Sequence, residues 1–421
     1  MGKKDRGASL SRREFIKTGS TVAAGAVSLA ALGAPAVLRG QNLNSKINIG
    51  VIGTGSRGCY LIRLMAEHPG ITVTDVCDIY PPHLEKGVED SKNDKVRTHE
   101  QWEKLIDQRD VDAVVVSPPL FLHVPCSVAA LQAGKHVLSE KSMALDMKQL
   151  KEVTATVENT GKVYLVGYQS RMAESYADAK RLVQGGVLGK TIQFYVHYDR
   201  NQTWRKDVPP ELERVLNWRM YREYCGGILT ELLTHQIDML LDILGTMPVK
   251  ASCEGRIMVY DDGREHHDSL MGHMVMDDDV IGVVSGTFCN SRWGNCWAIH
   301  GTHGTLEFMG NAFRVFFEKE TRHLSAVGIK HKFTKIKLGQ SLDVSDSPVT
   351  VPDKLVDYTG STTRNSSAKM VDHFYNCIVE GEKPVMDAAS ASRPSIAAFM
   401  LYHSSHDGGR QYTREEIEAM G

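Results

Sequence analysis

The chain has 421 residues, of which 49 are Lys or Arg and 51 are Asp or Glu, so its net charge is −2 at pH 7. The first 36 residues carry six Lys or Arg and two Asp or Glu, a net charge of +4, and the remainder therefore carries about −6. An acidic surface of mixed charge gives no reason to expect nucleic acid or an anionic membrane as a partner. Eight scattered cysteines without a C-x-x-C pair support neither a disulfide framework nor a metal site, so we expect no bound metal.

The start of the chain has the pattern of a twin-arginine export signal. Residues 11–17 are Ser-Arg-Arg-Glu-Phe-Ile-Lys, and residues 21–38 form a weakly apolar, Gly-broken stretch with small residues at 34–36. Such a stretch suits a cleaved signal better than a membrane span. We expect a signal peptide at residues 1–36, a linker at 37–46 and a folded, periplasmic protein without a membrane segment. A disordered basic tail before a cytoplasmic enzyme is the alternative.

A short apolar run at residues 47–52 ends in the glycine pattern Gly53-x-Gly55-x-x-Gly58. A second apolar run follows and ends at Asp78. Strand, glycine turn, helix and acidic strand end in this order are typical of a dinucleotide-binding unit. A carboxylate at the second strand end accepts hydrogen bonds from a ribose and repels a 2′-phosphate, so the pattern predicts NAD rather than NADP. A purely structural glycine turn is the alternative.

Three further apolar runs, at residues 111–116, 134–138 and 163–166, predict more strands of the same parallel sheet. Ligands of such sheets gather at the carboxyl ends of the strands, where polar side chains follow these runs. The predicted cofactor contacts lie in the glycine turn and at the strand ends: Gly53, Gly55, Ser56, Arg57, Gly58, Asp78, Ser117, Pro118, His123, Glu140 and Gln169.

Three side chains are predicted to be catalytic. Lys141 follows a predicted strand end, where it can relay a proton beside a cofactor. Glu231 and His235 are four residues apart on an amphipathic helix, so the carboxylate can orient the imidazole. Asp238 could instead be the acceptor that orients His235. The alternatives are a surface salt-bridging lysine for Lys141, and a helix cap and surface ion pair for Glu231 and His235.

With these residues the chain resembles the Gfo/Idh/MocA family of oxidoreductases over nearly all of its length after the signal. The matching positions are the glycine turn, the strand ends and the later Glu–His helix: Gly53–Gly58, Asp78, Ser117-Pro118-Pro119, His123, Glu140-Lys141, residues 167–171, Glu231, His235 and Asp238. Two positions depart from the family pattern. Ser142 replaces a Pro after the lysine, and Glu231 replaces an Asp, so the part that Glu231 plays is less clear than those of Lys141 and His235.

The resemblance implies an α/β fold in two parts. Residues 47–166 would form a Rossmann domain with a doubly wound parallel sheet. Residues 167–421 would form an α+β domain with an open, mainly antiparallel sheet, for substrate and oligomer contacts, and a C-terminal helix at residues 392–406 that packs back. Alternating patterns at residues 191–198 and 280–288 agree with strands there. The resemblance also implies a homo-oligomer.

Residues 195–224 interleave aromatic rings with Arg and Asn, which suits a carbohydrate site. The set comprises Tyr195, His197, Tyr198, Arg200, Asn201, Trp204, Arg205, Asn217, Trp218, Arg219, Tyr221 and Arg222. Ordinary surface contacts are the alternative for each. The predicted substrate contacts are Arg171, Tyr198, Trp218, Arg219 and Asp238.

The predicted function is hydride transfer from a ring carbon of a sugar or glycoside to tightly bound NAD, with Lys141 and His235 as the proton relay. Soluble NAD is scarce outside the cytoplasm, so an exported enzyme must carry and recycle it. Two alternatives stay open. One is an NAD-dependent glycosidase that oxidises, eliminates and reduces in turn, and the other is a non-catalytic sugar-binding protein.

Overall fold

The computed structural model describes residues 46–292, 294–310, 312–317, 334–336, 354–359 and 365–421. All of these lie within one compact unit that spans residues 40–421. The predicted signal peptide and all but the last residue of the predicted linker lie outside the described residues. None of the described helices combines the length and apolarity needed to cross a membrane.

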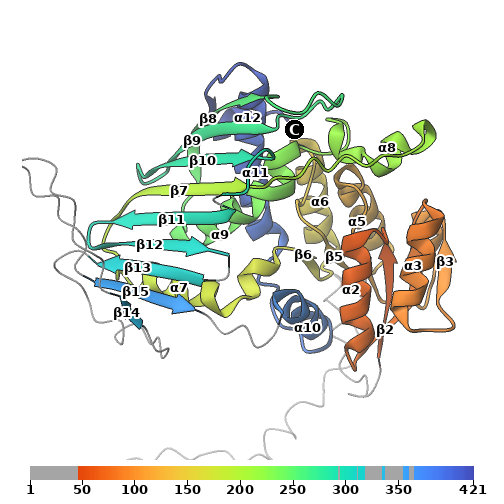
Figure 1. The fold of residues 1–421 in the computed structure, drawn as a ribbon. Coiled ribbons are helices and arrows are strands. Elements are labelled where there is room, and N and C mark those ends of the chain that lie inside the picture. The colour runs from red at the N-terminus through yellow and green to blue at the C-terminus, as the bar shows by residue number, and fades with distance from the viewer. Residues whose placement is uncertain (1–45, 293, 311, 318–333, 337–353, 360–364) are drawn as a thin grey trace, which may run out of the picture. The chain divides into compact units, whose positions relative to one another are not determined.

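A six-stranded parallel sheet, sheet A, forms the first part of the described chain (Figure 1). Its strands are β1 (Ile47–Ile52), β2 (Ile71–Cys77), β3 (Arg97–His99), β4 (Ala113–Val116), β5 (His136–Ser139) and β6 (Tyr164–Val166). Every residue of β4 and β6 is buried, as expected for a parallel sheet covered by helices. The strand order β3-β2-β1-β4-β5-β6 reverses direction between β1 and β4, which is where ligands of such sheets bind.

Short helices connect these strands. They are α2 (Ser56–Glu67), α3 (Pro81–Ser91), α4 (Trp102–Ile106), η1 (Leu120–Leu122), α5 (His123–Gln132), α6 (Met147–Thr160), η2 (Gln169–Met172) and α7 (Glu174–Gln184). Helices α2 and α3 pack against each other and on β2, whereas α5 packs on β4 and β5. The helix α2 begins directly after the glycine turn, so its N-terminus lies at the strand-order reversal.

A ten-stranded sheet, sheet B, follows in the chain (Figure 1). Its strands are β7 (Thr191–Asp199), β8 (Pro248–Arg256), β9 (Ser269–Met276), β10 (Ile281–Thr287), β11 (Asn295–Gly301), β12 (Gly304–Met309), β13 (Ala312–Phe317), β14 (Thr334–Ile336), β15 (Lys354–Thr359) and β16 (Tyr412–Thr413). The order is β14-β15-β13-β12-β11-β7-β10-β9-β8-β16. Among the pairings described, β7 with β10 is parallel and the others are antiparallel.

Helices of the second half pack on sheet B and tie it to sheet A. They are η3 (Pro210–Leu212), α8 (Glu213–Leu216), η4 (Trp218–Met220), the π-helical η5 (Leu229–Leu233), α9 (Thr234–Leu244), α10 (Ser366–Val379), α11 (Ala388–His406) and α12 (Arg414–Glu418). Helix α9 contacts β7 and β11, and α11 contacts β8 as well as α6 and β6. Helix α10 contacts α2. One continuous cluster of buried apolar residues therefore runs through both sheets.

The predicted fold class is confirmed: a parallel sheet with interleaved helices precedes a mainly antiparallel sheet. The strands expected at residues 191–198 and 280–288 are β7 and β10. Their parallel pairing was not predicted, because residues far apart in the chain determine it. The helix expected after the glycine turn is α2, which starts at Ser56.

Candidate active site

Two glycines of the turn after β1 are required by the protein itself. Gly53 has a φ of +85°, and a Cβ there would lie 2.5 Å from the backbone nitrogen of Pro118. A Cβ at Gly58 would lie 1.9 Å from the carbonyl oxygen of Gly53. At Gly55 the nearest atom to a Cβ would be in the His83 ring, 3.8 Å away. A Cβ at Gly55 would make only an ordinary van der Waals contact with the protein, so a ligand can approach the backbone at this glycine.

The N-terminus of α2 offers free backbone donors at this place. Its N-cap residue is Gly55, which has no side chain to cap the helix, and its first turn carries no acidic residue. Unsatisfied N–H groups and the helix dipole together favour an anion. Ser56 and Arg57 occupy the first two helical positions. The turn therefore fits the pyrophosphate of a dinucleotide.

Asp78 directly follows β2, and hydrogen bonds fix the orientation of its carboxylate. Its carboxylate accepts hydrogen bonds from the backbone nitrogens of Thr54, at 2.8 Å, and Tyr80, at 2.9 Å, and lies 3.5 Å from Nδ1 of His83. Burial raises the pKa of this carboxyl, but the contacts with His83, Tyr80 and Thr54 outweigh burial and hold the pKa below its ordinary value. An ionised carboxylate beside the glycine turn suits the ribose hydroxyls of NAD.

Arg57 links three parts of the chain around the glycine turn. Its Nε donates to Glu140 at 2.7 Å, its guanidinium also donates to Gln169 at 3.4 Å, and it donates to Ser367 at the start of α10 at 3.1 Å. Glu140 follows β5 and Gln169 follows β6, so the predicted strand-end residues do meet. The geometry makes Glu140 and Gln169 supports for Arg57 in this structure. Gln169 also lines a second cleft, of about 490 Å³.

Hydrogen bonds from two directions hold the loop that carries Lys141. Ser117 at the end of β4 donates to the carbonyl oxygen of Gly53 at 2.7 Å. His123 lies between the carbonyl oxygens of Pro118, at 3.0 Å, and Ser142, at 2.8 Å. The Lys141–Ser142 peptide bond is cis, and the Ser142 hydroxyl donates to the carbonyl oxygen of Thr230. His123 is only 3 % exposed, so it holds this loop from within.

Lys141 and Glu231 meet where the two sheets approach. The ammonium group of Lys141 donates to the backbone carbonyl oxygen of Glu231 at 2.9 Å. The Glu231 carboxylate is buried and accepts from Nε of Arg219 at 2.9 Å. Burial raises the pKa of Glu231, but the positive charges of Lys141 and Arg219 outweigh burial and hold the pKa below its ordinary value. Glu231 is therefore an anion between two cations.

His235 is a neutral imidazole near the same lysine. Burial, with Lys141 and Arg57 as neighbouring cations, holds its pKa well below 6.5. Its Nδ1 is buried and has no hydrogen-bond partner among the described residues. The ring meets the Tyr168 ring edge-on at 6.0 Å between centroids. A neutral imidazole can accept a proton from a substrate hydroxyl.

The prediction that Glu231 or Asp238 orients His235 is not supported by these contacts. Residues 229–233 form a π-helical turn, in which the angle between successive side chains is smaller than in an α-helix. Glu231 and His235 are nevertheless not joined, because Nδ1 of His235 has no hydrogen-bond partner among the described residues. Glu231 bonds Arg219 and Asp238 bonds Arg171, which leaves the imidazole without either partner.

A cleft of about 480 Å³ opens at these residues. Its lining joins the first turn of α2, two of the three predicted catalytic residues and the segment after β7: Ser56, Lys141, Arg200, Gln202, Thr203, Trp204, Arg205, Lys206, Leu216, Arg219, Glu231 and Leu232. The third predicted catalytic residue, His235, does not line it. The guanidinium of Arg219 lies 4.0 Å from the Trp218 ring centroid and 5.3 Å from that of Trp204. The predicted pair Trp218-Arg219 thus lies at the cleft, with Arg219 in its wall and Trp218 behind that guanidinium.

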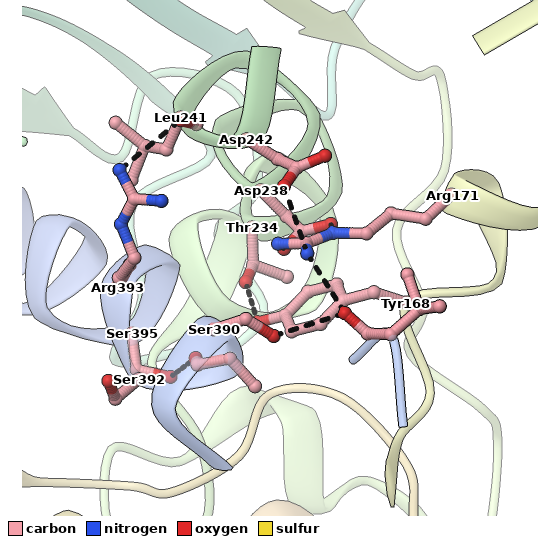
Figure 2. Close-up of polar contacts among 12 residues, drawn as sticks. Tyr168, Arg171, Thr234, Asp238, Leu241, Asp242, Ser390, Ser392, Arg393 and Ser395 are labelled. Atoms are coloured by element: carbon pink, nitrogen blue, oxygen red, sulfur yellow. Dashed lines mark hydrogen bonds and ion pairs between the residues drawn. The ribbon is translucent and has the colours of Figure 1, made fainter. Parts of the chain in front are cut away.

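Arg171 and Asp238 are placed elsewhere, in a buried ionic cluster between η2 and α9 (Figure 2). Arg171 donates twice to Asp238, at 2.5 and 2.9 Å, and once to Asp242, at 3.3 Å. Tyr168, beside them, shares a hydrogen bond with Thr234. The side chains of Arg171 and Asp238 are 3 % and 1 % exposed, and neither lines the cleft. We therefore revise their predicted substrate contacts to a structural role, because the two side chains are buried and bonded to each other.

Other members of the predicted substrate set have similar structural duties. Tyr198 is half-buried in β7 and packs on the core without lining the cleft. Asn217 bonds the backbone of Lys206 through both its amide oxygen and its amide nitrogen. Sequence reasoning missed Gln202, Thr203 and Lys206 as cleft residues. Their place beside Trp204 and Arg205 was the available signal.

Within the described chain, no three His, Cys, Asp or Glu side chains are arranged to hold a metal ion. The eight cysteines are all free, and six of them are buried.

Comparisons with known proteins agree with this geometry. The model of the oxidoreductase family with an NAD-binding Rossmann fold (GFO_IDH_MocA) matches residues 47–168, and the GFO/IDH/MocA C-terminal domain model matches residues 176–307. The 2,7-anhydro-N-acetylneuraminate hydratase of Mediterraneibacter gnavus is 27% identical over 273 residues, which are 62% of this chain and 67% of the relative. The scyllo-inositol 2-dehydrogenase (NAD(+)) of Bacillus subtilis is 23% identical over 83% of this chain and 91% of the relative. A levoglucosan dehydrogenase solved in complex with NADH superposes with a TM-score of 0.69 at 18% identity, covering 88% of this chain and 99% of that one.

Proposed function

Because the chain belongs to the Gfo/Idh/MocA family of NAD-binding oxidoreductases, we propose that it oxidises a ring carbinol of a sugar or glycoside by hydride transfer to bound NAD. One observation carries the proposal: Lys141, Glu231 and the first turn of α2 line one cleft, with neutral His235 close by. Relatives named as an inositol dehydrogenase and as an anhydro-sugar hydratase support a carbohydrate substrate.

Lys141, His235 and Glu231 have different parts in the transfer of the hydroxyl proton. When bound, NAD accepts the hydride that leaves the carbinol carbon. Lys141 uses one of its three N–H donors on the carbonyl oxygen of Glu231, so two remain for the substrate oxygen. The neutral imidazole of His235 takes the hydroxyl proton. Glu231 contributes negative charge that stabilises Lys141 and fixes Arg219 in the cleft wall.

The first test removes the lysine. We expect Lys141→Ala to lower kcat by about 10² to 10⁴-fold, the usual contribution of a positioned acid–base group. Bound nucleotide, measured by mass spectrometry of the purified protein, stays at the level of the unaltered chain. Lys148→Ala, which changes an exposed lysine of α6, is the matched control and keeps full activity. Full activity of the Lys141 variant would contradict the proposal.

A second candidate is an NAD-dependent glycosidase in which oxidation, loss of the aglycone and reduction leave no net change in the nucleotide. The relative named as a hydratase favours it, because adding water is not a net redox reaction. Nitrophenol released from aryl glycosides without added NAD and without accumulating NADH would support this candidate. Accumulation of NADH at 340 nm with an oxidised sugar product supports the dehydrogenase. No absorbance change and no aglycone with any sugar would point to a sugar-binding protein.

We also propose that the protein is exported to the periplasm in folded form with NAD already bound. The paired arginines at residues 12–13 and the apolar stretch that follows support this route. A nucleotide that cannot exchange outside the cytoplasm has to be recycled on the protein, by a second sugar or within one catalytic cycle. Nucleotide found in protein recovered from the periplasm supports the proposal, and recovery only from the cytoplasm contradicts it.

A further inference from the structure

The cleft carries more positive than negative side chains. Five of its lining residues are cations, namely Lys141, Arg200, Arg205, Lys206 and Arg219, whereas Glu231 is its one carboxylate. A neutral sugar needs both hydrogen-bond donors and hydrogen-bond acceptors for its hydroxyl groups. Several unpaired cations add little to its binding. The surplus charge therefore points to something in the ligand beyond hydroxyl groups.

Neighbouring carboxylates neutralise only part of this charge. Arg219 pairs with Glu231, and Arg205 pairs with Glu213 at 2.9 Å. Lys141, Arg200 and Lys206 form no ion pair with any carboxylate in the part of the chain that the structure describes. In addition, Nη1 of Arg205 is buried without a hydrogen-bond partner there. An unpaired guanidinium nitrogen of this kind is costly unless an acceptor arrives.

The cations Arg200, Arg205 and Lys206 lie in one segment, residues 200–206, which we call the cationic wall. Hydrogen bonds to the rest of the protein hold this segment in place. Thr203 accepts hydrogen bonds from Arg264 at its carbonyl oxygen and its hydroxyl, at 2.9 and 3.0 Å. Asn217, which is 1 % exposed, accepts a hydrogen bond from the backbone nitrogen of Lys206 and donates one to its carbonyl oxygen. Between them Trp204 has a φ of +61°, a conformation rare for a bulky residue and typical of functional positions. The segment is therefore held in place against the cleft.

Resting on the function proposed above, we propose that the substrate carries an anionic oxygen group, and that Arg200, Arg205 and Lys206 bind it. The group is a carboxylate, as in an acidic sugar, or a phosphate or sulfate ester. The pyrophosphate of the cofactor does not account for these cations as well as a substrate does, because the free N-terminus of α2 already serves it. Lys141, beside Glu231, remains available for the reacting hydroxyl.

The experiment compares matched sugars on the nucleotide-loaded protein. The probes are D-glucuronate against D-glucose, D-galacturonate against D-galactose, and glucose 6-phosphate and glucose 6-sulfate against glucose. Affinity is measured by calorimetry at about 50 mM and about 500 mM salt, since screening weakens such contacts. We expect at least one acidic probe to bind about tenfold more tightly than its neutral partner at low salt, with a smaller preference at high salt. Which acid prevails separates a carboxylate from an ester.

Variants of Arg205 and Lys206 test whether the cationic wall causes the preference for an acidic sugar. Arg205→Gln and Lys206→Gln should each bring the affinity for the acidic probe close to that for its neutral partner, while bound NAD is retained. Lys206 is exposed, so its variant guards against a folding defect caused by breaking the Arg205–Glu213 pair. Arg214→Gln is the control, because Arg214 pairs with Glu223 on the exposed side of α8 and does not line the cleft.

The outcomes separate this inference from the proposed function. If every acidic probe binds no more tightly than its neutral partner, the inference is overturned, and it is also overturned if the variants weaken NAD binding alone. Oxidation of neutral sugars without any acidic preference leaves the proposed function standing by itself. Tight binding of an acidic sugar with neither NADH nor aglycone formed supports the anion site and rejects the proposed function.

Discussion

The side chain of His235 shows how much chemistry burial and neighbouring charge can determine. An exposed histidine titrates near pH 6.5, but burial and the cations Lys141 and Arg57 push the pKa of His235 well below that value. The imidazole is therefore neutral throughout the neutral range. A proton acceptor has to be neutral. A protonated imidazole would also be repelled by the nearby Lys141.

We predict that Lys141→Met raises the pKa of His235, because one of the two cations that lower it is gone. The pKa remains below 6.5, since burial is the larger cause. NMR titration of the imidazole resonances measures both values, and Lys148→Met is the control that leaves the pKa unchanged. In the unaltered protein the activity should not fall between pH 7.5 and 6.5 through protonation of His235. A ring that titrates at or above pH 6.5 would contradict the lowered pKa.

At the scale of elements, the π-helical turn and the buried clamp beside it set the arrangement of the site. The turn at residues 229–233 directs Glu231 toward Arg219 while α9 continues regularly from Thr234. The pair Arg171–Asp238 fastens α9 to η2, which follows the last strand of sheet A. Burial raises the pKa of Asp238 to about 6 in spite of Arg171, so the carboxylate is still ionised at pH 7.

We predict that Arg171→Met lowers the free energy of unfolding by about 3 to 5 kcal/mol, because the buried Asp238 loses its cation and has to be either protonated or left as an unpaired charge. The double variant Arg171→Met, Asp238→Leu should recover most of that loss, since no uncompensated charge remains. Chemical denaturation at pH 7 measures all three proteins. The protein that remains folded should keep an unchanged KM for its sugar. A raised KM at unchanged stability would restore the original prediction that these residues contact substrate.

Sequence patterns predicted the elements whose causes are local. The glycine turn, Asp78 and Lys141 could be placed because each follows an apolar strand, and parallel strand ends meet at one edge. The partners of Glu231 could not, because Arg219 and Lys141 reach it from other segments of the chain. Arg171 looked like a free polar side chain for the same reason. Its partner is 67 residues away, and only the packing of η2 on α9 brings the two together.

At the scale of the whole molecule, sheet B has one face that the helices described above do not account for. On the inner face, a Cβ at Gly286 would meet Ile228 and Leu233 of the segment leading into α9. The opposite face presents alternate residues of β9 and β10, where Met271 lies across from Ser285, and Ile281 lies across from Val275. Met271 and Ile281 are 63 % and 48 % exposed. Apolar side chains gathered on one sheet face are typical of a surface that binds another protein.

We predict that this face joins copies of the chain into a symmetric homo-oligomer, as a self-complementary sheet surface permits. The double variant Met271→Asp, Ile281→Asp should reduce the molar mass in solution to that of one chain, because each copy would bring two new carboxylates without partners into the interface. Light scattering after size-exclusion chromatography measures the mass. Met420→Asp, at an exposed apolar residue near the end of α12, is the control and should not change it. The dissociated chain should keep its bound nucleotide, since the glycine turn, Asp78 and Arg57 all lie within one copy. An unaltered protein that already has the mass of a single chain would contradict the prediction.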